Sequence, residues 1–66
     1  MLLKQYFNGT VYILAQNGET FEGIVEDYVF PEDNESGEES IVLKTHNGAL
    51  YEFTAETIEK IVLLSR

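Results

Sequence analysis

Few side chains in this sequence could carry catalysis or hold a metal ion. The chain has no cysteine, which excludes a thiol nucleophile, a disulfide and a thiolate zinc site. Its one histidine, His46, directly precedes an Asn-Gly pair, where a polar residue at the end of a strand is expected to face solvent. A single histidine cannot form a two-histidine metal site, and the five glycines form neither a Walker loop nor a dinucleotide-binding fingerprint. We therefore expect no enzyme activity, no metal and no cofactor.

The densest group of titratable side chains is an acidic segment at about residues 31–39. Seven of the twelve Asp and Glu residues lie within residues 26–39. With Gly37 at the sixth position of an EF-hand loop, the twelfth position is Leu43, which offers no carboxylate. The segment predicts an exposed loop between two strands, with a docking site for a basic partner or an irregular, weak divalent-ion site as alternatives. A docking loop would use Glu32, Asp33, Glu35, Glu38 and Glu39.

The overall charge limits the class of partner. Twelve acidic residues oppose four basic ones, which gives a formal net charge of −8 at pH 7. Binding to phosphates depends on cationic side chains, so this balance argues against non-specific nucleic-acid binding and against an anionic membrane surface. No apolar run approaches the roughly 20 residues of a membrane span, and the first residues do not resemble a signal peptide. We expect a soluble, cytoplasmic protein.

The length of 66 residues predicts one domain, residues 1–66, and 44% hydrophobic residues are ordinary for a folded chain. A chain this short buries only about 60% of the surface that its unfolded form exposes. Small domains commonly compensate with disulfides, metals or self-association. Because the first two are disfavoured here, the composition favours self-association.

Two Asn-Gly pairs, Asn17-Gly18 and Asn47-Gly48, predict β-hairpins with type I′ turns, because such turns need positive φ at both central residues. Gly23, inside the long second strand, indicates a bulge or a sharp bend. Apolar residues alternate with the others, as at Val11, Ile13 and Ala15. The two hairpins are expected to join residues 10–16 to 19–30 and residues 40–46 to 49–53.

The remaining elements complete a small barrel. Residues 54–57 predict one helical turn and residues 58–64 a last strand. Apolar residues at helical spacing before Asn8-Gly9 predict a short N-terminal helix, with an extended arm as the alternative. The sequence therefore predicts a mainly β fold, a five-stranded barrel of SH3-like type.

Two segments resemble the motifs of the Sm-like family of small barrels. Residues 21–28 resemble its first motif, which forms a bent second strand, and residues 53–61 resemble its second motif, which joins strands four and five. After the second strand, RNA-binding members carry an Asn that has no counterpart in residues 28–31. Thr54-Ala55 replaces the Arg-Gly that opens the second motif. The resemblance implies the barrel and assembly through strands four and five, without an RNA site.

We expect a non-catalytic module that binds proteins, above all further copies of itself. The expected interaction surface lies on the last two strands and comprises Tyr51, Phe53, Ile58, Ile61 and Leu63. One alternative is a divergent Sm-like ring that binds single-stranded RNA and gathers Lys44, Lys60 and Arg66 into repeated patches. Another is an acidic regulator or decoy that covers the basic surface of a nucleic-acid-binding protein.

Overall fold

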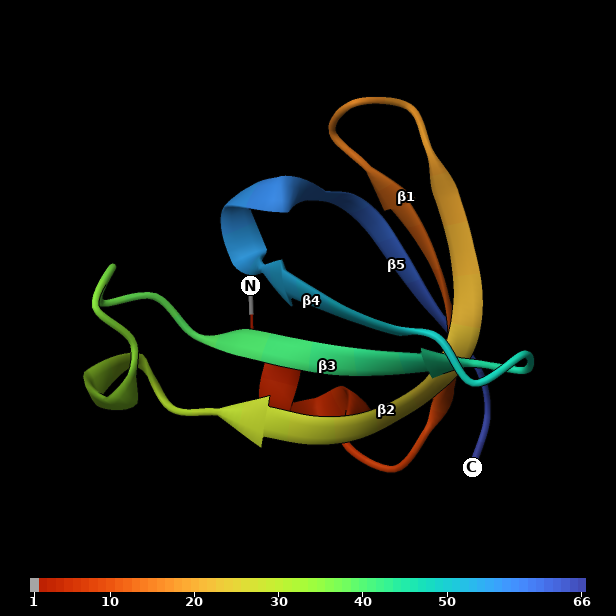
Figure 1. Cartoon of the computed structure of the whole chain (residues 1–66), viewed down its shortest axis with the longest axis horizontal. Helices are drawn as coiled ribbons and strands as arrows, with labels where there is room; N and C mark the ends of the chain where they lie inside the picture. Colours follow the sequence, from red (N-terminus) through yellow and green to blue (C-terminus); the bar gives the residue numbers. More distant parts are fainter. Residues whose placement is uncertain (1) are drawn as a thin grey trace.

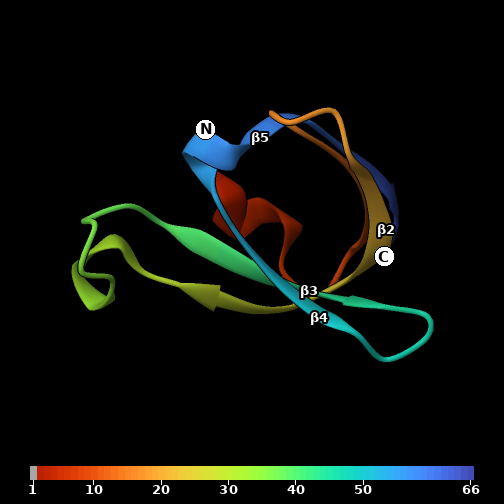
Figure 2. The same ribbon diagram turned by 45° about the horizontal axis from the view of Figure 1, so that its top comes forward.

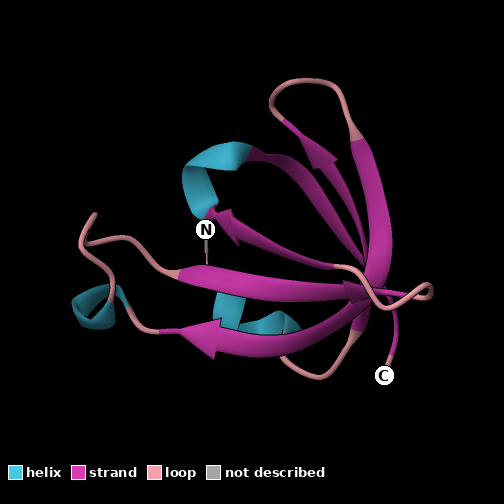
Figure 3. Cartoon of the chain, in the orientation of Figure 1, coloured by secondary structure: helices cyan, strands magenta, loops and turns pink. Residues whose placement is uncertain are grey.

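The computed structural model describes residues 2–66, which form one curved antiparallel sheet with three short 3-10 turns (Figure 1, Figure 3). The mainly β class predicted from the sequence is confirmed, and the predicted N-terminal helix is a single 3-10 turn. None of these helical turns is long and apolar enough to cross a membrane. The strands are β1 (Thr10–Ala15), β2 (Thr20–Val29), β3 (Ser40–Thr45), β4 (Leu50–Thr54) and β5 (Ile58–Ser65), and the turns are η1 (Leu3–Tyr6), η2 (Pro31–Asp33) and η3 (Ala55–Thr57).

The sheet has the strand order β4-β3-β2-β1-β5, so β4 and β5 are its two edges. The long strand β2 lies in the middle and bends between the two halves of the sheet (Figure 1, Figure 2). The sheet curls far enough for Phe21 of β2 to meet side chains of β4, two strands away. The centroid of the Phe21 ring lies 4.9 Å from that of Tyr51 and 5.0 Å from that of Phe53. The result is a barrel-like sheet whose two edges do not pair.

Gly23 stands where β2 bends, as the sequence predicts. It pairs with Val11 of β1 on one side and with Thr45 of β3 on the other. A Cβ atom at this position would overlap the carbonyl oxygen of Lys44 and lie 2.9 Å from its carbonyl carbon. Only glycine allows this approach of the two backbones. The bulge itself lies further along β2, at the register shift between Val25 and Asp27.

The two hairpin turns occur at the predicted Asn-Gly pairs, but the predicted turn type is wrong. Among residues 2–66, Asn8 is the one non-glycine residue with positive φ, so Asn17 and Asn47 do not adopt type I′ geometry. Each loop instead has three residues and ends in a glycine with φ near +89°, which is the left-handed position of a bulged turn. The Oδ1 atom of each Asn accepts a hydrogen bond from the N–H two residues later, at 3.0 Å and 3.2 Å. This bond explains the preference for Asn.

The core lies inside the curl of the sheet and is closed on one side by η1. The predicted alternation in β1 is confirmed, since Val11, Ile13 and Ala15 are all buried. Leu3 of η1 is fully buried and packs into the same cluster. The buried apolar residues are Leu3, Val11, Ile13, Ala15, Val25, Ile41, Leu43, Phe53 and Ile58.

Candidate functional site

The free edge of β4 is defined by the hydrogen-bond pattern of the second hairpin. The N–H of Thr45 donates to the carbonyl of Ala49, at 2.9 Å, and bonded pairs then alternate along the two strands. The backbone groups of Tyr51 and Phe53 therefore face β3. Those of Leu50, Glu52 and Thr54 point outward, away from the sheet.

The free edge of β5 follows from the same alternation. The N–H of Ala15 donates to the carbonyl of Glu19, whereas the N–H of Gln16 donates to the carbonyl of Thr57. Even-numbered residues of β1 therefore bond to β5, where they pair with Lys60 and Val62. The backbone groups of Ile61 and Leu63 point outward.

The two edges carry exposed apolar side chains. Tyr51 and Leu63, both predicted as interface residues, are 42% and 39% exposed, and Ile61 is half-buried. Phe53 and Ile58 were also predicted there, but their side chains lie in the core, which leaves only their backbones near the edges. Both of these residues lie on the inner face of the sheet, where they belong to the hydrophobic core.

Sequence reasoning missed three exposed apolar residues at the same edges: Leu50, Val62 and Leu64. The available signal was the run of apolar residues 61–64 in the last strand. A strand that buries one face needs an apolar residue only at every second position. The additional apolar side chains therefore indicate that the other face of this strand also needs to be covered.

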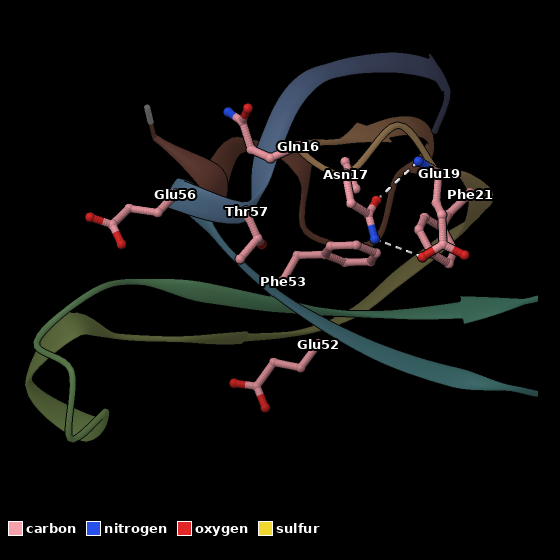
Figure 4. Close-up of a pocket in the computed structure, with 9 residues that line it drawn as sticks. Gln16, Asn17, Glu19, Phe21, Glu52, Phe53, Glu56 and Thr57 are labelled. Carbon is pink, nitrogen blue, oxygen red and sulfur yellow. Dashed lines mark hydrogen bonds between the residues drawn. The ribbon is translucent and has the colours of Figure 1, made fainter.

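A groove of about 490 Å³ lies between β4, η3 and the tip of the first hairpin (Figure 4). The rings of Phe21 and Phe53 meet edge to face in it, and Phe53 points toward the hairpin (Figure 4). No basic residue lines this groove. Its acidic residues are Glu19, whose carboxylate accepts a 2.8 Å hydrogen bond from Asn17, and Glu52 and Glu56, which point away from the hairpin (Figure 4).

The acidic loop is held to the body of the protein by Glu39. Its Oε1 atom accepts hydrogen bonds from the N–H of Leu3 and from the hydroxyl of Tyr28, each at 3.0 Å. Desolvation raises the pKa of Tyr28, and the hydrogen bond to Glu39 and the negative charges of Glu39 and Glu32 raise it further. Glu39 therefore supports the fold and is not free for docking.

A second contact secures the base of the loop. Ser40 is fully buried, and its hydroxyl donates to the Glu52 carboxylate at 2.7 Å and accepts from the Asn34 amide at 3.1 Å. The amide of Asn34 also donates to the carbonyl of Glu38, at 2.7 Å. Three of the five predicted docking residues, Glu32, Asp33 and Glu35, remain exposed.

The basic residues do not form one patch on the described surface. Lys44 is exposed on β3 and Lys60 on β5, with β2 and β1 between these strands. The Arg66 guanidinium donates hydrogen bonds to the carbonyls of Gln5 and Phe7. His46 is exposed at the second turn, as predicted.

No three His, Asp or Glu side chains within residues 2–66 lie close enough together to hold a metal ion. Comparisons of the chain with protein-family models, with curated proteins and with solved structures found no match.

Proposed function

We propose that this chain is a non-catalytic, self-assembling interaction module in which β4 of one copy pairs with β5 of the next. The observation that carries this proposal is that both edges combine outward backbone groups with exposed apolar side chains. Folded proteins usually protect such edges, because open edges pair readily with other strands. Pairing of two edges satisfies the backbone groups with hydrogen bonds and covers the apolar side chains at the same time.

Charge favours pairing between unlike edges over pairing between like ones. Along β4 and η3, Glu52 and Glu56 are exposed without a neighbouring basic residue on these elements. β5 carries one exposed base, Lys60, beside one exposed acid, Glu59, and so has no net charge of its own. Two β4 edges would bring like carboxylates together, whereas β4 against β5 separates them. Such a head-to-tail contact closes into a ring or continues as a filament.

The test is the oligomeric state in solution, measured by light scattering across a dilution series at micromolar concentration. We expect the wild-type protein to be an oligomer and Leu64→Lys, at the β5 edge, to be a monomer. Ile24→Lys is the matched control, because Ile24 is 50% exposed and Leu64 is 49% exposed, but Ile24 lies on a central strand. A wild-type protein that is monomeric throughout the series would remove the proposal.

A further inference from the structure

The two free edges restrict how they can pair. On β4, the outward backbone groups belong to Leu50 and Glu52, whose side chains lie on the outer face of the sheet. On β5 they belong to Ile61 and Leu63, which are paired with the fully buried Ile13 and Val11 and so lie on the inner face. Facing residues of an antiparallel pair have their side chains on the same face. Antiparallel pairing of β4 with β5 therefore requires the second copy to be flipped, so that the inner face of one copy continues into the outer face of the other.

This inversion places the inner row of β4 beside the outer row of β5. Tyr51 and Phe53 form the inner row, since they pair with the buried Leu43 and Ile41. Lys60 and Val62 form the outer row of β5, opposite Leu14 and Tyr12. The pairing thus carries Lys60 of a second copy to the side of β4 where the Phe53 ring and the groove lie.

The side chains select one register among those that the backbone allows. One register sets Leu50 against Leu63 and Tyr51 against Val62, which covers exposed apolar residues on both strands. A shift of two residues in one direction brings Glu52 opposite Glu59. The same shift in the other direction sets Glu52 against Leu63 and leaves Leu50 without an apolar partner. Like charges and unmatched apolar side chains disfavour both shifted registers.

We infer that neighbouring copies pair antiparallel with Tyr51 opposite Val62 and with Lys60 of the second copy opposite Phe53, so that Lys60 occupies the groove. This inference rests on the proposed self-assembly and specifies its geometry. The aliphatic stem of a lysine packs on apolar surface while its ammonium group stays near water and carboxylates. In this groove the stem lies on the Phe53 ring and the ammonium group lies toward Glu19. The second copy thereby supplies the cation that the groove lacks.

Disulfide trapping tests the register, because the chain has no native cysteine. Tyr51 and Val62 would face each other at a non-hydrogen-bonded position, where Cα atoms are about 4.5 Å apart and a disulfide fits. We expect the double variant Tyr51→Cys, Val62→Cys to form intermolecular disulfides under mild oxidation, seen as a ladder on a non-reducing gel. The control pair Tyr51→Cys, Leu63→Cys places the thiols on opposite faces and should not cross-link.

Charge reversal tests the role of the groove. We expect Lys60→Glu to weaken assembly at least tenfold and the double variant Lys60→Glu, Glu19→Lys to recover most of it. Lys4→Glu makes the same change of charge on η1, beside Phe30 at the end of the central strand β2, and should leave assembly unchanged. The proposed register is refuted if the wild type assembles but the Tyr51→Cys, Val62→Cys variant does not cross-link, whether or not the control variant does. If Lys60→Glu assembles like the wild type, Lys60 does not occupy the groove. A monomeric wild type would instead refute the proposed function.

Discussion

Replacing Gly23 with alanine tests whether the close approach of β2 and β3 holds the curved sheet together. An added Cβ atom would overlap the Lys44 carbonyl oxygen and would lie 3.1 Å from the Cα atom of Thr45. These neighbours are backbone atoms, so no side chain can rotate to make room. β3 must move away from the bend or β2 must straighten, and either change disturbs the packing of Leu43, which is fully buried.

The expected cost is large for a chain of this size. Overpacking a tight site costs about 1–3 kcal/mol, and a clash with backbone falls toward the upper end, at about 2–3 kcal/mol. At about 0.05–0.15 kcal/mol per residue, a 66-residue domain has a free energy of unfolding of about 3–10 kcal/mol. Each 1 kcal/mol shifts the melting temperature of such a domain by about 4–8 °C, so Gly23→Ala should lower it by about 10–20 °C.

Thermal and urea unfolding followed by circular dichroism measure this effect. Protein concentration must be held fixed, because the proposed self-association would stabilise the folded chain by mass action. Gly37→Ala is the matched control: it has open space around it and a φ of +76°, so alanine there costs only the conformational strain of about 1 kcal/mol. Equal stability of the two variants, or a Gly23→Ala protein as stable as the wild type, would refute the steric argument.

Three further predictions concern the acidic loop and the charge of the chain. Because the pKa of Tyr28 is raised on folding, its contribution to the free energy of unfolding is complete at pH values below its ordinary pKa of 10.0 and is lost as the pH rises through the pKa of the folded state. Tyr28→Phe should therefore reduce the loss of stability at alkaline pH that unfolding experiments measure. Ser40→Ala should lower the free energy of unfolding by about 1–2 kcal/mol, whereas the exposed Ser36→Ala should change it little. Assembly should strengthen as salt rises from about 0.05 to 0.5 M, because copies with a net charge of −8 repel each other; light scattering that shows the reverse would contradict this balance.

The strands could be predicted from the sequence because each has a strong local pattern. Alternation at Val11, Ile13 and Ala15 reflects a strand with one buried face, and the Asn-Gly pairs mark both turns. The turn type could not be read in the same way, because Asn-Gly suits both a two-residue loop and a three-residue loop with a bulge. Which one forms depends on the register of the flanking strands.

The candidate site was harder to predict because it depends on contacts between distant segments. In β4, both Leu50 and Phe53 are apolar, so the pattern does not say which of them faces the core. The curl of the sheet, which brings Phe53 against Phe21, determines that Phe53 is the residue that faces the core. The curl depends on the close approach of the two backbones at Gly23. Glu39 reads as one more loop acid, but its partners are a backbone N–H 36 residues away and the hydroxyl of Tyr28.

The distribution of charge is consistent with assembly through β5. The acidic loop projects from the end of β2 and β3, far from the C-terminal end of the chain in both views (Figure 1, Figure 2). Proteins commonly protect an edge strand with charges, a proline or a bulge. β5 has one register irregularity at Glu59 and a second at Leu64, and it carries the charged Glu59 and Lys60 near its start, so only residues 61–63 have none of these devices. In the proposed assembly, repulsion between acidic loops would oppose indiscriminate association at long range, while residues 61–63 of β5 would allow one specific edge contact at short range.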